Sequence, residues 1–306
     1  MAIVLVLPFV LVAVLVAALV WALAASRGPL TAPEHAAVVQ QHRRSTRWFT
    51  WGIGLALVVT VALLALAGIA QGRVAALAPA VGGLALLLTM CIGELRSPRQ
   101  TTLTRTAVAR PRRARDHVGA GPLALATLSV LALAATLVVG TVMGSPDDLG
   151  RAGRALTTVC GDVTTIRGPW PGSYYAIPIA VALAIGLVSA VITCRTIAAR
   201  PAQGAEGADV DDAVRRWSTR SVLLAVALVC WATLVPLLLL MTAAHSGGTC
   251  ATSSTRTFQL AFGAGALASA VAAVGTFAAL CVGPRLRTGQ APPPGSPDRS
   301  PVGVPR

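Results

Sequence analysis

The sequence predicts an all-α fold, a polytopic bundle of helices that crosses a membrane. Hydrophobic residues make up 55% of the 306 residues, and charged residues only 12%. The mean hydropathy is +0.73. Several apolar runs reach the roughly 20 residues that a helix needs to cross the hydrocarbon core of a bilayer. These three observations together indicate an integral membrane protein.

Seven apolar stretches have the length and composition of transmembrane helices. Residues 1–283 are therefore expected to form one membrane domain, and the proline-rich residues 284–306 a disordered cytoplasmic tail. The expected helices cover residues 3–25, 49–70, 74–94, 122–143, 176–194, 221–243 and 260–283.

The first stretch has one feature of a signal peptide, because the small residues LAAS at 23–26 would suit a peptidase. Two features argue against cleavage. No positive charge precedes the apolar run, and the run is longer than the roughly 7–15 residues of a signal-peptide core. We therefore expect residues 3–25 to stay as a helix with the N-terminus outside the cell.

The arginines predict the orientation of the remaining helices. All 25 basic residues are arginine, and with the N-terminus outside, twenty fall in cytoplasmic segments and five in outer ones. Cytoplasmic loops of plasma-membrane proteins carry such an excess of positive charge. The C-terminus is therefore expected in the cytoplasm.

The densest group of arginines lies in RSPRQTTLTRTAVARPRRARDH, residues 96–117. We expect this loop to stay in the cytoplasm and to contact membrane lipids, including anionic head groups. No aromatic residue stands between the arginines to stack on a base, so nucleic-acid binding is not expected. The lipid-facing residues of this loop would be Arg96, Arg99, Arg105, Arg110, Arg112, Arg113 and Arg115.

Aromatic residues mark both predicted membrane surfaces. Trp48 and Trp51 lie where the second span leaves the cytoplasm, and Trp170, Tyr174 and Tyr175 lie where the fifth span begins outside. Tryptophan and tyrosine are enriched at this depth, so these five residues are predicted to be interfacial anchors. The second group lies in GPWPGSYYAIP, and the lip of a small-molecule site is an alternative interpretation for it.

After the first span, the chain is predicted to form three helical hairpins, each closed by a cysteine near its cytoplasmic end. These cysteines, Cys91, Cys194 and Cys281, are interpreted as reduced apolar residues and not as metal ligands. Cys160 and Cys250 instead fall in predicted outer loops. Because the exterior is oxidising, we predict a disulfide between them.

A short polar helix is expected before the sixth span, in DVDDAVRRWSTR. Asp209 would cap it, and the pairs Asp211–Arg215 and Asp212–Arg216 have the i, i+4 spacing of helical ion pairs. A metal-binding DxD motif is the alternative interpretation, although nothing nearby completes such a site.

The predicted spans contain few side chains that could take part in catalysis. All four histidines lie in predicted loops and the chain has no lysine, so no base is available to activate Ser129, Ser189 or Ser269. These serines are interpreted as packing residues. Glu94 is the carboxylate at a span edge, and we expect it to meet water or Arg96. The sequence therefore predicts no catalytic residue, no cofactor and no metal site.

The spans do show features of helix packing. Gly82 and Gly83 make the middle of the third span thin, and small faces let membrane helices approach closely. Pro79 and Pro236 could bend the third and sixth spans, as in a gated path or a static bundle.

One stretch of about 135 residues, 91–225, carries a family resemblance. GELRSPRQTTLTRTAVARPRRARDHV, PWPGSYYAIPIAVALAIGL, RTIAARP and DDAVRRWSTR together resemble a group of multi-pass integral membrane proteins from actinobacteria. The absence of lysine and asparagine agrees with a very GC-rich genome. The resemblance implies a location in the cell membrane, and the group has no established activity to transfer.

Three hypotheses for the function remain open. The first is a non-catalytic membrane component, such as an accessory or regulatory partner of a transporter or of an envelope sensor, that docks through its arginine-rich loops. The second is a transporter or channel for an uncharged or weakly polar solute. The third is a membrane-embedded enzyme, which would depend on the acidic residues near Asp211.

Overall fold

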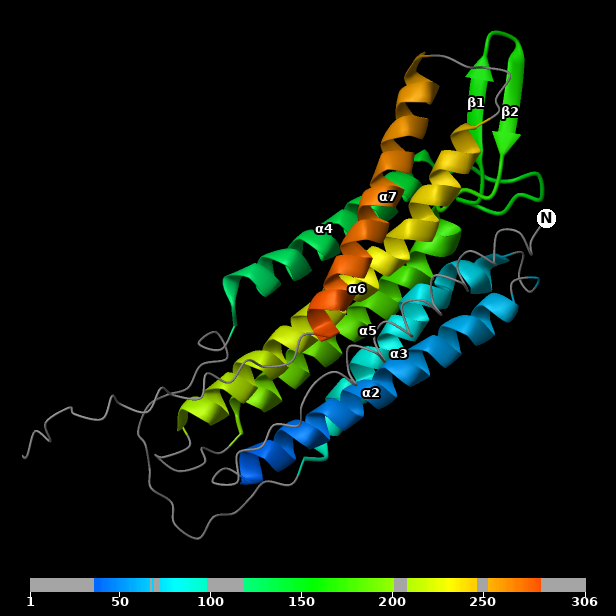
Figure 1. Cartoon of the computed structure of the whole chain (residues 1–306). Helices are drawn as coiled ribbons and strands as arrows, with labels where there is room; N and C mark the ends of the chain where they lie inside the picture. Colours follow the sequence, from blue (N-terminus) through cyan, green and yellow to red (C-terminus); the bar gives the residue numbers. More distant parts are fainter. Residues whose placement is uncertain are drawn as a thin grey trace, which may run out of the picture.

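The computed structural model describes residues 36–66, 68, 72–97, 118–200, 208–246 and 253–281. Six of its helices are long and apolar enough to cross a membrane (Figure 1). The chain is therefore a multi-pass helical membrane protein. The predicted first span, residues 3–25, lies outside the described residues, so a count of seven stays a prediction. The helices are α2 (Ala36–Ala65), α3 (Arg73–Leu95), α4 (Ala120–Met143), α5 (Ser173–Ala198), α6 (Ala208–His245) and α7 (Ser253–Cys281).

Each of the six other predicted spans overlaps one of these helices, but α2, α6 and α7 begin well before the predicted starts, and α2 ends at Ala65 and not at residue 70. α2 starts at Ala36, and α6 starts at Ala208 and runs unbroken for 38 residues. The predicted short polar helix is thus the beginning of α6, because no glycine or proline interrupts residues 208–235. A helix of this length is about 57 Å long. It therefore extends well beyond the roughly 30 Å hydrocarbon core of a bilayer.

Helix α6 is the centre of the bundle. It packs against all five other described helices, and it has the largest buried share of any span. α2 is the most peripheral helix and packs mainly on α3, which in turn packs on α5 (Figure 1). Neighbouring helices along the chain run in opposite directions, so the bundle has two distinct ends.

We name these ends by their contents. The arginine-rich end is where α2 and α6 begin and where α3 and α5 end (Figure 1). The hairpin end is the opposite one, where α3 and α5 begin. It carries a β-hairpin of β1 (Leu156–Cys160) and β2 (Val163–Arg167), which pair antiparallel.

No strand is predicted in the all-α fold, so this hairpin is an addition to it. Its sequence, LTTVC-GD-VTTIR, nevertheless contains a hairpin signal. β-branched residues favour strands, and a two-residue glycine-containing turn suits a hairpin. Gly161 indeed has a φ of 56°, which glycine adopts readily.

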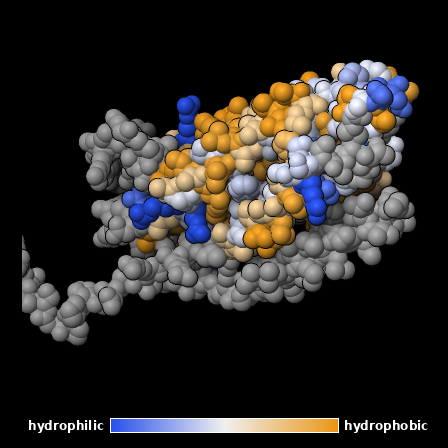
Figure 2. Space-filling view, turned by 90° about the horizontal axis from the view of Figure 1, so that it is seen from above, coloured by the Kyte–Doolittle hydropathy of each residue, from blue (hydrophilic) through white to orange (hydrophobic). Residues whose placement is uncertain are grey.

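The outer surface of the helices is apolar. Large side chains such as Val58, Leu131, Val188 and Leu267 are each more than half exposed. Figure 2 shows hydrophobic residues over the middle of one face and hydrophilic residues gathered toward its ends. This distribution suits a surface that contacts lipid, whereas an apolar patch of this extent would be rare on a soluble monomer.

The predicted close approach at the middle of the third span is confirmed. A Cβ atom at Gly82 would lie 2.8 Å from the carbonyl oxygen of Ala56 in α2. A Cβ atom at Gly83 would lie 2.4 Å from both γ-carbons of Val229 in α6. The two glycines therefore let α3 pack tightly between a helix on each side.

We expect Gly83→Ala to destabilise the bundle by about 1–3 kcal/mol, the usual cost of adding a carbon to a closely packed core. The measurement is thermal unfolding in detergent micelles. Gly275→Ala in α7 is the matched control, because a Cβ atom there meets nothing within 4 Å. Equal melting temperatures for the two variants would contradict the packing described for α3.

Candidate functional site

At the arginine-rich end, Glu94 joins three segments of the chain. It lies in the last turn of α3 and is 8% exposed. It accepts a hydrogen bond of 3.1 Å from Ser45 Oγ in α2, and it forms an ion pair with Arg200, which follows α5. The expected contact with Arg96 is wrong. Residues two positions apart on a helix do not face each other, and Arg96 is exposed while Glu94 points into the bundle.

Arg215 in α6 is fully buried, with no exposed surface. Its Nε and Nη2 donate to Asp211 Oδ2 at 3.0 and 2.8 Å, which confirms the predicted i, i+4 pair. Its other donors reach the end of α5, where they bind the carbonyl oxygens of Ala198 at 3.2 Å and Arg200 at 2.9 Å. The last carbonyls of a helix lack partners within the helix and carry partial negative charge. Arg215 therefore caps α5.

These contacts form one connected set, which we call the ion-pair network: Ser45, Glu94, Arg200, Asp211 and Arg215. Arg200 is the central member, because its side chain binds Glu94 and its carbonyl oxygen binds Arg215. The network connects α2, α3, α5 and α6. Charges this deeply buried are costly unless they are paired and hydrogen-bonded, so the network holds the four helix ends in one arrangement.

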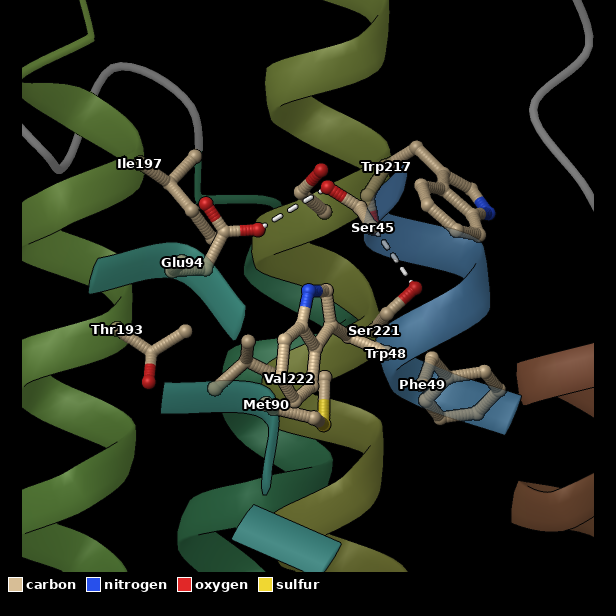
Figure 3. Close-up of a pocket in the computed structure, with 11 residues that line it drawn as sticks. Ser45, Trp48, Phe49, Met90, Glu94, Thr193, Ile197, Trp217, Ser221 and Val222 are labelled. Atoms are coloured by element: carbon tan, nitrogen blue, oxygen red, sulfur yellow. Dashed lines mark hydrogen bonds between the residues drawn. The ribbon is translucent and has the colours of Figure 1, made fainter. Parts of the chain in front are cut away.

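A small cavity lies beside the network (Figure 3). Its volume is about 20 Å³, enough for roughly one water molecule. Ser45, Glu94 and Trp217 are among its lining residues, together with Ser218, whose Oγ is buried and has no hydrogen-bond partner among the described residues. A water molecule there would satisfy Ser218. The cavity as it stands is too small for an organic solute.

Exposed charge differs strongly between the two ends of the bundle. Among the described residues, the arginine-rich end has five exposed arginines, whereas at the hairpin end Arg256 is the exposed arginine. The five are Arg43, Arg47, Arg96, Arg195 and Arg216. Glu94, Asp211 and Asp212 at the arginine-rich end are buried or partly buried. Of the seven arginines predicted to face lipid from the second cytoplasmic loop, only Arg96 is described; the other six lie outside the described residues.

The five predicted aromatic anchors differ in exposure. Trp51 is 69% exposed on α2, as an interfacial anchor would be, and Trp48 is half-buried against Gly93. Trp170 and Tyr175 are buried, at 0% and 1% exposure, so their expected role against lipid must be corrected. Tyr174 is partly buried.

The packing around Gly140 explains the burial of Trp170. The indole Nε1 donates a hydrogen bond of 2.7 Å to the carbonyl oxygen of Gly140 in α4. A Cβ atom at Gly140 would lie 2.3 Å from the carbonyl oxygen of Pro171, so only glycine permits this approach. The indole also contacts the rings of His245 and Phe262, which lie on α6 and α7. Trp170 thus closes the hairpin end of the bundle from inside.

A second charged group lies in the loop before β1. Asp147 Oδ2 binds Arg151 Nη2 at 2.7 Å and Arg154 Nη1 at 2.9 Å. Asp147 Oδ1 accepts hydrogen bonds from the backbone N–H groups of Leu149 and Arg151. The hydrogen bond from the Arg151 side chain is the main reason that the pKa of Asp147 falls to about 2. This carboxylate fixes the fold of its loop.

The remaining predicted site residues are the two outer cysteines, the serines of the spans and Asp209. Cys250 and the side chain of Cys160 lie outside the part of the chain that the structure describes, so their disulfide stays a prediction. Ser129 and Ser189 are buried and donate to backbone carbonyls of their own helices. Asp209 falls in the first turn of α6. Within the described ranges, no three histidine, cysteine or acidic side chains gather to hold a metal ion.

Comparison with known protein families, with curated proteins and with solved structures finds no match to this chain.

We expect removal of one member of the Glu94–Arg200 pair to cost roughly 3–5 kcal/mol, because the other charge stays buried without a partner. The double variant removes both charges at once. Its loss of unfolding free energy should therefore be smaller than the sum of the losses measured for Glu94→Gln and for Arg200→Gln. Unfolding of all three proteins in detergent measures this coupling. Arg195→Gln, at an exposed site on α5, is the control. Additive losses would contradict a direct pair.

The folded-state pKa of Asp147 lies below its ordinary value of 3.8. Its stabilising contribution is therefore complete above about pH 4 and is lost as the pH falls toward 2. We expect the loop to keep its backbone structure down to about pH 4, and the Asp147 carboxyl to titrate near pH 2 by carbon-detected NMR. Arg151→Gln should move this midpoint up toward 3.8. An unchanged midpoint would show that Arg151 is not the cause.

Proposed function

We propose that this protein is a non-catalytic component of the cell membrane, an accessory or regulatory subunit that docks an acidic protein partner on its arginine-rich end. The observation that carries the proposal is the set of five exposed arginines at that end, where the carboxylates of Glu94, Asp211 and Asp212 are buried or partly buried. Complementary charge steers association and selects partners.

The proposed orientation places this end in the cytoplasm. Positive residues are retained on the cytoplasmic side of multi-pass proteins. The exposed arginines follow that rule, since five of them lie at the arginine-rich end. At the hairpin end, four of the five arginines are partly buried and bound within the protein. The hairpin and the Asp147 loop then lie outside the cell.

The ion-pair network supports a docking role more than a catalytic one. Among the described residues, the carboxylates of Glu94 and Asp211 are both committed to arginines, so neither is available as a base. Pairing also fixes the ends of four helices, which gives the exposed arginines a defined spacing. A preformed surface loses less entropy when a partner binds.

The absence of lysine decides how a partner can be captured, because amine-reactive cross-linkers need lysine. A photo-activated amino acid at Thr46, an exposed position between Arg43 and Arg47, avoids this difficulty. We expect irradiation of living cells of the native host to trap one partner in stoichiometric amount. Purification in mild detergent and mass spectrometry would identify it.

Three variants test whether charge is the cause of binding. Changing the five exposed arginines to glutamine should abolish the cross-link, whereas changing them to lysine keeps the charge and should retain it. Arg256→Gln at the hairpin end should have no effect. Purification of the chain alone, or capture of the same partner by the glutamine variant, would refute the proposal.

A further inference from the structure

Two arginines at the hairpin end meet at one aromatic ring. Arg73 is the first residue of α3, and Arg154 lies in the loop before β1. Their guanidinium carbons lie 4.5 and 5.7 Å from the ring centroid of Tyr174, near the start of α5. Cations are attracted to an aromatic face, but two cations at one ring also repel each other. The arrangement therefore concentrates positive charge.

The charge of this group is only partly neutralised. Asp147 is the carboxylate that pairs with Arg154, and it also pairs with Arg151. Arg73 has no ion-pair partner among the described residues. The Nε atoms of Arg73 and Arg154 are both buried, and neither has a hydrogen-bond partner within the described ranges. Buried donors of this kind are usually satisfied in a native protein, so the hydrogen-bonding capacity of the two guanidinium groups is only partly used within the described residues.

The loop that carries Arg154 is held in place. Gly153 has a φ of 69°, and a Cβ atom there would lie 2.2 Å from Ser173 Oγ. The carbonyl oxygen of Arg154 accepts a hydrogen bond of 2.8 Å from the backbone N–H of Trp170. The other arginine is fixed by its place on α3, which packs against α5. The backbone that carries both arginines is thus held in place, and both guanidinium groups lie against the Tyr174 ring.

Two helix N-termini add to the positive potential. α3 and α5 both begin at this end, and neither has a side-chain cap on its first free N–H groups. Such groups carry partial positive charge and attract anions. Arginine donors and helix N-termini together suit an oxyanion with several oxygens, and phosphate fits this set better than a single carboxylate.

We propose that Arg73, Arg154 and Tyr174 form a binding site for a phosphate group at the hairpin end of the protein. The phosphate belongs to a phospholipid head group of the outer leaflet or to a soluble phosphate compound. The site is independent of the partner surface proposed for the arginine-rich end, since the two lie at opposite ends of the bundle (Figure 1).

Two measurements on the full chain distinguish a lipid phosphate from a soluble phosphate. Native mass spectrometry of protein mixed with phosphatidylglycerol tests the lipid, and thermal unfolding of delipidated protein with inorganic phosphate tests the soluble anion. We expect one retained lipid, or a saturable rise in melting temperature with phosphate that chloride at equal ionic strength does not produce. Failure of the wild-type chain in both measurements would overturn the proposal.

Variants then test the residues. Arg73→Gln leaves the Asp147 contacts intact and should weaken binding at least tenfold, and Arg73→Lys, which cannot donate in a planar fork, should fall between it and the wild type. Arg154→Gln should act in the same direction. Arg256→Gln, an exposed arginine at the same end, should bind normally. Unchanged binding in Arg73→Gln, with a melting temperature like that of the wild type, would show that the arginines only support the fold.

Discussion

A buried guanidinium must have acceptors for its donors, and Arg215 has no exposed surface at all. Its hydrogen bonds to Ala198 and Arg200 hold the end of α5 against α6, and this contact brings the side chain of Arg200 to Glu94. Glu94 then binds α2 through Ser45. The arrangement of four helix ends therefore depends on satisfying one buried charge.

The described arginines that form ion pairs are buried or partly buried. Arg200 and Arg215 pair with Glu94 and Asp211 at the arginine-rich end, and Arg151 and Arg154 pair with Asp147 at the hairpin end. Six other described arginines are exposed, and five of them lie at one end. Exposed charge is available both to the membrane surface and to a partner. This is why the proposed orientation and the proposed docking surface concern the same end of the molecule.

The fold could be predicted from the sequence where the cause is local. Apolar runs placed six helices, glycines marked the close approach at Gly83, and i, i+4 spacing gave the pair of Asp211 and Arg215. Contacts between distant segments could not be predicted in this way. Glu94 and Arg200 are 106 positions apart, and no spacing rule relates them. Only the packing of α3 on α5 brings them together.

Two further differences have identifiable physical reasons. Trp170 is of a residue type common at membrane surfaces, but the glycine at position 140 lets the backbone at Pro171 approach α4 closely, and the indole then donates a hydrogen bond to the Gly140 carbonyl oxygen. The hairpin is weakly marked in the sequence, because its strands of five residues are short beside the apolar helices, although its turn and its β-branched residues favour it. The unexplained arginine donors at Tyr174 became apparent only in three dimensions, because residues 73, 154 and 174 belong to separate segments.

The sidedness of the bundle is the most direct test, because the proposed docking role requires the arginine-rich end to lie in the cytoplasm. Single cysteines at Thr46 and Asp162, both exposed and at opposite ends, would be introduced into a chain without its native cysteines. The account predicts that a membrane-impermeant thiol reagent labels Asp162→Cys in intact cells and labels Thr46→Cys only after permeabilisation. Labelling of Thr46→Cys in intact cells, with Asp162→Cys protected, would contradict it.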